Sequence, residues 1–504
     1  MGMQERETIP PVSRRGFLAA GAVAGAATLA PRAALAAEQA DVVIVGAGLS
    51  GLHAAELLID VGMKVVILEA GDRVGGRVNT VQTVEGPIDV GASQVGRSYA
   101  RVLDACQRYG LKLISEDRDL LPFGAHFMDS WIDPKTWEAN PLNKTVGDER
   151  RILPMLMGQQ MAARYNPLKE LDDWLDPRFA ASDISLRTLM RQHGHSEAAI
   201  QLARWSVPGI GMDETSMLRM WQEDVRTNFD RKMGAGATAA AKRDHPFGEA
   251  NDHQLLSGLA AISNIEGGTS RLPLAMAAKL GDVIRLKKIV GAIAMTDKGA
   301  TVSCADGSTF KARFVVSAIP FPMLRQIAIT GRANPLATTA IKTMPYANTA
   351  RMYLTVDRPF WQEDGLPASF STDGPLGMFW AIDNHKGTGR HRAMIVLVGE
   401  MGQKIATMDQ RGVQQFLLDE LARLRPASRG LVKVATYKDW LSDPLQRGCG
   451  FSLAPGQVNA FARDMVKPWQ VMHFAGEHTR RLDFGMESAM ESGERVATEI
   501  GARA

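Results

Sequence analysis

The chain has 504 residues, of which 45% are hydrophobic and 22% are charged. This length exceeds what one hydrophobic core usually serves, and the composition excludes a disordered chain, so we expect a globular protein of two successive or interleaved domains. The 58 basic and 55 acidic residues nearly cancel, with no long block of one sign, and therefore indicate no nucleic-acid partner. Three scattered cysteines are too few for a disulfide scaffold or a zinc site.

Residues 1–36 are predicted to be a targeting segment. They contain the pair Arg14 and Arg15, an apolar stretch over 17–29 and a small-residue cleavage site at 34–36. The arginine pair resembles a twin-arginine export signal, which predicts a partner in the twin-arginine export machinery and a periplasmic or secreted mature chain. An uncleaved anchor is the alternative, although a membrane span needs roughly 20 apolar residues. We expect no stable membrane span in the mature chain.

A glycine turn lies between a short buried strand, predicted over 41–45, and a helix, predicted over 50–62. The turn carries the spacing of a dinucleotide-binding fingerprint. Gly46 allows the sharp turn, Gly48 lets the backbone approach a pyrophosphate, and Gly51 lets the helix pack closely on the strand. The N-terminus of the helix would face the phosphate charge. The segment therefore predicts a dinucleotide cofactor and does not distinguish NAD from FAD.

The next strand ends at Glu69, which lies 18 residues after Gly51 and can accept hydrogen bonds from an adenosine ribose. Two glycines between two arginines follow it: Arg73, Gly75, Gly76 and Arg77. Adjacent glycines let the backbone approach a flat or charged ligand, and the guanidinium groups can meet phosphate. As a bare pattern, the same loop is also compatible with a surface turn.

Five segments, in order, resemble the flavin-containing amine oxidase family, which includes monoamine, polyamine, L-amino acid and nicotine-type oxidases. They are the loop 73–77, residues 89–113, 266–293 and 473–479, and the stretch 485–500. The resemblance implies that the cofactor is FAD. It also implies that Val290 holds the adenine through backbone bonds, and that Gly476, Glu477 and Met486 lie at the flavin.

The resemblance implies an α/β fold in which a Rossmann-like, glutathione-reductase-type FAD-binding domain is interleaved with an α+β substrate-binding domain. The first would comprise residues 37–100, 256–320 and 445–504, and the second residues 101–255 and 321–444. Within the second, we expect strands in "TARMYLTVDRPFW" and "RAMIVLVGEM", and a helix in "GVQQFLLDELARLRP". Residues 118–255 are predicted to be mostly helical, with a Gly/Ala-rich loop at 233–253.

Arg351 stands where many members of this family keep a lysine that holds a water at the flavin. Alternation along 349–356 places Arg351 on a polar face that looks either at the flavin or at solvent. A guanidinium is not deprotonated in proteins, so we expect an electrostatic role for it in catalysis.

Two further positions depart from the family pattern. Members often hold the amine between two aromatic rings, and the matching positions here are Gly450 and Gly485, which leave room for a bulkier or flatter substrate unless Phe451 or Phe484 turns inward. Cys449 lies nine residues after Trp440, the register at which monoamine oxidases bond a cysteine to the flavin. Ordinary packing of a buried thiol explains Cys449 equally well.

The leading functional prediction is an FAD-dependent oxidoreductase that oxidises an amine to an imine by hydride transfer to flavin N5. Oxygen or a periplasmic electron carrier would then reoxidise the flavin. The alternative is an FAD-dependent dehydrogenase or oxidase of a bulky non-amine substrate, acting on a C–C or C–O bond, which the missing aromatic pair and lysine favour. A flavin-bearing binding protein without catalysis is a third hypothesis. The sequence leaves open the small-molecule substrate and whether the chain forms a homo-oligomer.

Overall fold

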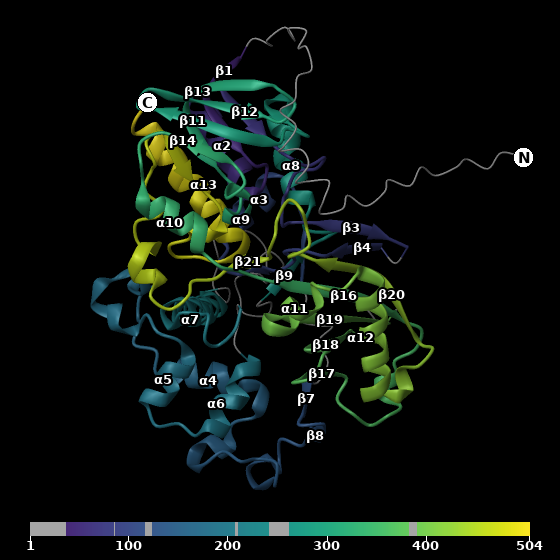
Figure 1. Ribbon diagram of the computed structural model, residues 1–504. Helices are drawn as coiled ribbons and strands as arrows, with labels where there is room; N and C mark the ends of the chain where they lie inside the picture. The colour runs from purple at the N-terminus through teal and green to yellow at the C-terminus, as the bar shows by residue number, and fades with distance from the viewer. Residues whose placement is uncertain (1–36, 85, 116–122, 207–209, 241–261, 383–390) are drawn as a thin grey trace, which may run out of the picture. The chain divides into compact units, whose positions relative to one another are not determined.

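The computed structural model describes residues 37–504, apart from 85, 116–122, 207–209, 241–261 and 383–390 (Figure 1). The predicted targeting segment, residues 1–36, lies outside the described residues. Residues 37–504 form one contiguous unit, so the boundaries of the two expected domains stay a prediction. Among the described helices, none is both long enough and apolar enough to cross a bilayer.

The larger of the two main sheets has eight strands in the order β10-β2-β1-β13-β12-β11-β14, with β22 paired to β13. Its core is parallel, since β1 runs parallel to both β2 and β13. The consecutive residues Val42, Val43 and Ile44 are fully buried, as a parallel strand requires. The strands are β1 (Glu38–Val45), β2 (Val65–Leu68), β10 (Ile284–Arg285), β11 (Val290–Thr296), β12 (Gly299–Cys304), β13 (Thr309–Ser317), β14 (Ala328–Thr330) and β22 (Met472–Phe474).

Helices α2 (Leu49–Asp60) and α13 (Gly485–Gly501) pack against each other beside this sheet (Figure 1). Their close approach depends on Gly493, where a Cβ atom would lie 2.6 Å from the Ser50 carbonyl oxygen. Two further helices, α3 (Ala100–Arg108) and α8 (Arg271–Leu280), contact α13 and α2 respectively. This arrangement confirms the predicted strand, glycine turn, helix and second strand, with the first strand longer than expected and the helix slightly shorter.

The second sheet has seven strands in the order β20-β16-β19-β18-β17-β7-β8. In β16 (Thr349–Val356), buried and half-buried residues alternate, as predicted. Helix α12 (Gln410–Leu424) shares a hydrophobic core with this sheet. The other strands are β7 (Phe123–Phe127), β8 (Ser130–Ile132), β17 (Ser369–Thr372), β18 (Met378–Ile382), β19 (His391–Val398) and β20 (Val432–Asp439).

The strands of each main sheet come almost entirely from the segments predicted for one of the two domains. Every strand of the second sheet comes from the segments expected to form the substrate-binding domain. Every strand of the larger sheet comes from the segments expected to bind the cofactor, except β14, which follows residue 320 and is paired in parallel with β11. Strand β14 therefore belongs to the larger sheet by hydrogen bonding, although it follows the boundary expected at residue 320.

Residues 118–255 are less uniformly helical than predicted, because β7 and β8 lie within them. The helix α7 (Met217–Ala240) also continues through residues 233–240, where we expected a Gly/Ala-rich loop; residues 241–253 of that loop lie outside the described residues. The other helices here are α4 (Met157–Arg164), α5 (Leu186–Gln192) and α6 (Glu197–Ala203).

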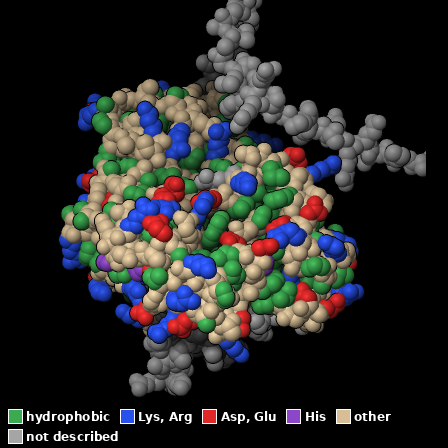
Figure 2. Space-filling view, turned by 60° about the horizontal axis from the view of Figure 1, so that its bottom comes forward, with side chains coloured by type: hydrophobic (Ala, Val, Ile, Leu, Met, Phe, Trp, Pro, Cys, Tyr) green, Lys and Arg blue, Asp and Glu red, His purple; other side chains and the backbone are tan. Residues whose placement is uncertain are grey.

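The described residues also form three small sheets. Strand β5 (Val95–Gly96) pairs with β9 (Ile262–Ile265), which also pairs with β6 (Leu113–Ser115), and β15 (Tyr346–Ala347) pairs with β21 (Gly450–Phe451). The third small sheet is the hairpin of β3 (Thr80–Thr83) and β4 (Gly86–Asp89), and three further helices are α9 (Phe321–Leu324), α10 (Pro335–Thr343) and α11 (Gly399–Ile405). On the face in Figure 2, basic and acidic side chains are interspersed, as the balanced composition leads one to expect.

Candidate cofactor and substrate site

The first glycine turn has the geometry that a close backbone approach requires. Gly46 has φ of 106°, a conformation that favours glycine, and its N–H donates to the Leu68 carbonyl at 2.8 Å. A Cβ atom on Gly51 would lie 2.1 Å from the Gly46 carbonyl oxygen, so the helix can approach the strand only with glycine there. A Cβ atom on Gly48 would meet nothing within 4 Å. The turn therefore leaves open space at the N-terminus of α2, where a pyrophosphate fits.

Glu69 lies directly beside this turn. Its carboxylate accepts the backbone N–H of Ala47 and that of Gly71, each at 2.8 Å, so it fixes the turn while its remaining lone pairs are available to a ribose. The Glu69 carbonyl accepts the N–H of Lys288 at 2.8 Å. This bond brings Val290, the first residue of β11, next to the same region, although its contact with an adenine stays a prediction.

The loop with adjacent glycines packs on the first turn. Gly75 and Gly76 have φ of 101° and 56°, and the Gly75 N–H donates to the Ala47 carbonyl at 2.8 Å. Arg73 donates to the carbonyl oxygens of Gly76 and Val78, at 2.7 and 3.2 Å. Arg73 therefore shapes its own loop, whereas we expected it to face phosphate; a phosphate contact for this residue stays a prediction.

Arg77 joins three segments that are far apart in the sequence. Its guanidinium donates to the Cys449 carbonyl at 2.6 Å and to the Glu477 carboxylate at 3.3 Å. Burial alone would lower the pKa of Arg77, but Glu477, Tyr346 and Cys449 together outweigh burial and the pKa is raised. The half-buried Cys449 thus lies beside the predicted flavin-binding residues. This position is compatible with a covalent bond to the flavin and also with ordinary packing of the thiol, so the bond stays a prediction.

The closing motif forms a tight turn after β22. Gly476 has φ of 124°, and its N–H donates to the Ser492 hydroxyl at 2.8 Å. A Cβ atom on Gly476 would lie 2.7 Å from the imidazole of His478, so this position also needs glycine. Met486, in the first turn of α13, is buried.

His478 is a feature that the sequence did not suggest. The side chain is buried against the ring of Phe321, and among the described residues neither ring nitrogen has a hydrogen-bond partner. Burial, together with the positive charges of Arg77 and Arg495, lowers the pKa of His478 to about 3. The imidazole is therefore neutral at physiological pH.

The half-buried Arg351 contacts the segment that follows the second glycine loop. Its guanidinium donates to the Gly91 carbonyl at 2.9 Å, and the neighbouring Ala92 N–H donates to the Arg77 carbonyl at 3.1 Å. This contact is compatible with a position near the flavin, but whether Arg351 faces the flavin or solvent stays a prediction. A direct role of Arg351 in catalysis stays a prediction.

The two glycines at the expected aromatic positions differ from each other. A Cβ atom on Gly450 would meet nothing within 4 Å, so space is open there. At Gly485, however, a Cβ atom would lie 2.9 Å from the hydroxyl oxygen of Tyr99. The expectation of open space at Gly485 is wrong, because Tyr99, whose ring meets Phe484 edge-on at 6.1 Å, occupies it. Phe451, the other aromatic neighbour, is buried.

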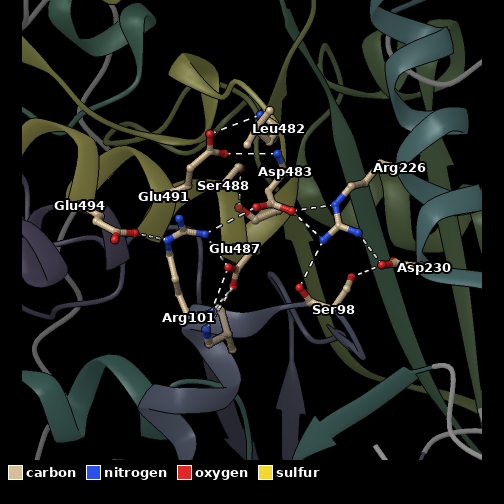
Figure 3. Close-up of polar contacts among 12 residues, drawn as sticks. Ser98, Arg101, Arg226, Asp230, Leu482, Asp483, Glu487, Ser488, Glu491 and Glu494 are labelled. Carbon is tan, nitrogen blue, oxygen red and sulfur yellow. Dashed lines mark hydrogen bonds and ion pairs between the residues drawn. The ribbon is translucent and has the colours of Figure 1, made fainter. Parts of the chain in front are cut away.

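A network of arginines and carboxylates fixes the N-terminus of α13 (Figure 3). Asp483 lies between Arg101, at 3.6 Å, and Arg226, at 2.6 Å, and these arginines come from α3 and α7 respectively. The buried Glu487 accepts the backbone N–H groups of Arg101 and Val102, at 3.0 and 3.1 Å. Burial raises the pKa of Glu487. Three helices are thereby tied together at the start of α13.

Comparison with known proteins agrees with this geometry. A family model described as flavin containing amine oxidoreductase matches residues 49–501. The chain is 26% identical to amine oxidase [flavin-containing] B of Homo sapiens and 25% identical to amine oxidase [flavin-containing] of Danio rerio, over 91% of this chain and 86% and 85% of theirs.

Solved structures show the same fold. Putrescine oxidase, wild type and bound to putrescine, has a TM-score of 0.70 at 21% identity, covering 92% of this chain and 99% of that one. Cyclohexylamine oxidase from Brevibacterium oxydans has a TM-score of 0.68 at 21% identity, with the same coverage. The likeness confirms an α/β fold with a Rossmann-like cofactor domain and a substrate domain.

Proposed function

The chain belongs to the flavin containing amine oxidoreductase family, and from this premise we propose that it oxidises a primary or secondary amine to an imine. It is an FAD-dependent enzyme. The most direct support is the contact between Arg77, in the second glycine loop, and Glu477, in the closing motif, which are 400 residues apart in the sequence. The first glycine turn joins them through the hydrogen bond from Gly75 to Ala47. Relatives named for amine oxidation support an amine as the substrate of this chain too.

The residues of the chain would hold the cofactor along its length. Gly48 and the N-terminus of α2 would face the pyrophosphate, Glu69 the ribose and Val290 the adenine, while Glu477 and the N-terminus of α13 would lie at the flavin. When bound, FAD supplies an acceptor for the hydride on the carbon next to the amine nitrogen. The protein contributes orientation and exclusion of water, and Arg351 contributes positive charge near the segment at Gly91.

Anaerobic mixing of the FAD-loaded protein with a panel of primary and secondary amines tests this function. We expect the yellow flavin absorbance to be lost in a single exponential with at least one amine, and an imine or its hydrolysis product to appear in equal amount. Substrates without nitrogen are the control, because bleaching by them alone would favour the C–C or C–O dehydrogenase. If no amine bleaches a fully loaded protein, the proposed reaction is wrong.

We further propose that the mature enzyme works outside the cytoplasm and passes electrons to oxygen or to a periplasmic carrier. The support is the pair Arg14 and Arg15, followed by an apolar stretch and a small-residue cleavage site. Replacing both arginines with lysine should leave the full-length precursor in the cytoplasm, whereas the unchanged chain should appear, shortened, in the periplasmic fraction. Equal distribution of the two proteins would contradict export by this route.

A further inference from the structure

Helix α13 begins without a cap of its own. The N-cap residue is Phe484, and among the described residues no side chain caps this end of the helix. The first N–H groups of a helix have no partner within it, and a nearby aspartate or glutamate commonly accepts hydrogen bonds from them. Two carboxylates lie close enough in the sequence to do so, Asp483 and Glu487. Each is bound to other groups.

Glu487 caps a different helix. It is the third residue of α13, the position from which a glutamate side chain often reaches back to the N-cap. Its fully buried carboxylate instead accepts the backbone N–H groups of Arg101 and Val102, in the first turn of α3, at 3.0 and 3.1 Å. Glu487 therefore satisfies α3 and leaves the N–H groups of α13 free.

Asp483, two residues before α13, is held by arginines from two other helices (Figure 3). Arg226 of α7 donates Nε to Asp483 at 2.6 Å and Nη2 to the Ser98 carbonyl at 3.3 Å. Arg101 of α3 lies 3.6 Å from the other oxygen of the Asp483 carboxylate. Burial alone would lower the pKa of Arg226, but Asp483 and Asp230 outweigh it and the pKa is raised, so Arg226 keeps its charge.

A second observation indicates that a polar ligand lies at this end of α13. The side chain of Tyr99 is buried, with 7% of the residue exposed, and its hydroxyl oxygen lies 2.9 Å from the place of a Cβ atom on Gly485. Among the described residues, this hydroxyl has no hydrogen-bond partner. Burial raises the pKa of Tyr99, so the hydroxyl stays protonated. Buried polar groups are almost always paired, which leaves a partner to be supplied here.

We propose that Arg226 and Arg101 are positioning residues of the flavin site, because they hold the Asp483 carboxylate away from the N-terminus of α13. The proposal rests on the assignment of the flavin to this helix end in the proposed function. Reduction of a flavin adds negative charge at its N1 and O2 edge, which free N–H groups and the positive end of a helix dipole stabilise. An unpaired carboxylate at the same place would oppose that charge. The two arginines therefore favour reduction of bound FAD, and they do so through Asp483.

The reduction equilibrium of bound FAD, measured by absorbance against a reference dye, tests the proposal without any substrate. In Arg226→Gln, the equilibrium constant for two-electron reduction should fall about 2- to 30-fold, the effect of one charge at a helix N-terminus. Arg226→Lys, which keeps the charge, should recover most of this loss. Asp364→Asn is the matched control, because it removes one charge from the buried pair with Arg425 in the core of the second sheet and should leave the equilibrium unchanged.

The Asp483→Asn background shows whether Arg226 acts through Asp483. Asp483→Asn alone should change the equilibrium less than twofold, and adding Arg226→Gln to it should have no further effect. An equal fall in both backgrounds would mean that Arg226 acts through its own charge, which would overturn the proposal. An unchanged equilibrium in Arg226→Gln would overturn it too. If Arg226→Gln does not fold, Arg101→Gln is the variant to measure; a fall is again expected, and no change would count equally against the proposal.

These measurements and the test of amine oxidation fail independently. A fall of the equilibrium constant in Arg226→Gln, with no amine able to reduce the unchanged protein, would support the positioning role and refute the proposed reaction. Reduction by amines, with the same equilibrium in Arg226→Gln as in the unchanged protein, would refute the positioning role and leave amine oxidation standing.

Discussion

Alanine substitutions at Gly48 and Gly51 separate the two roles of the first glycine turn. At Gly51, the added methyl would lie 2.1 Å from the Gly46 carbonyl oxygen, which is backbone and cannot move aside. We expect Gly51→Ala to destabilise the apoprotein by about 1–3 kcal/mol or more and to weaken FAD binding as well. At Gly48, φ is −77° and a methyl would meet nothing, so the stability of the apoprotein should change by less than about 1 kcal/mol.

Gly51→Ala should lower both the stability of the apoprotein and the affinity for FAD, whereas Gly48→Ala should lower mainly the affinity for FAD. The methyl in Gly48→Ala would take the space that we assign to the pyrophosphate, at a cost of about 1–3 kcal/mol, or roughly 5- to 150-fold in Kd. Thermal unfolding of the apoprotein and titration with FAD, followed by quenching of flavin fluorescence, measure both quantities. Gly412→Ala on α12, where a methyl makes an ordinary 3.6 Å contact, is the control for both. Unchanged FAD affinity in Gly48→Ala would refute the reasoning.

Three further substitutions test charges in the fold. The pKa of His478 is lowered to about 3, so below pH 6.5 the imidazole takes up a proton in the unfolded chain but not in the folded chain, and the free energy of unfolding decreases as the pH is lowered. Between pH 6.5 and 5, the decrease measured by urea unfolding should be about 1.5–2 kcal/mol smaller for His478→Leu than for the unchanged protein. Glu477→Gln, which replaces the carboxylate beside Arg77 with a neutral amide, should destabilise the apoprotein by about 1–2 kcal/mol in the same assay. Asp364→Asn removes the charge paired with the fully buried Arg425 and should cost about 3 kcal/mol, with unchanged FAD affinity on titration.

The features that could be predicted from sequence are those set by neighbouring residues. The run of β-branched residues at Val42, the glycine spacing after it and the following helix are local, and the structure confirms their order. The same holds for β16, where the alternation of side chains alone indicates which face is buried. For the site, spacing indicated Gly46, Gly48 and Gly51, and the structure gives each the conformation or free space that its expected role needs.

Other features depend on partners that are distant in the sequence. Strand β7 has no clear alternation of its own and is a strand because it pairs in parallel with β17, so that Phe123 lies opposite Ser369. Likewise, nothing near Gly485 indicates that Tyr99 fills the space beside it. Local patterns contain no information about such pairings, because the energy that fixes them comes from tertiary contacts.

The cluster of Arg219, Glu223 and Arg480 shows why a local pattern can also mislead. An arginine and a glutamate four residues apart on a helix are typical of a solvated face, where such a pair contributes about 0.3–0.5 kcal/mol. In α7 the arginine of this pair is 7% exposed, and Arg480, more than 250 residues further along the chain, shares its glutamate. Once buried, the same pair is costly unless its remaining donors are satisfied. The fold therefore places two arginines against the Phe451 ring at a cost in stability that their shared glutamate only partly offsets.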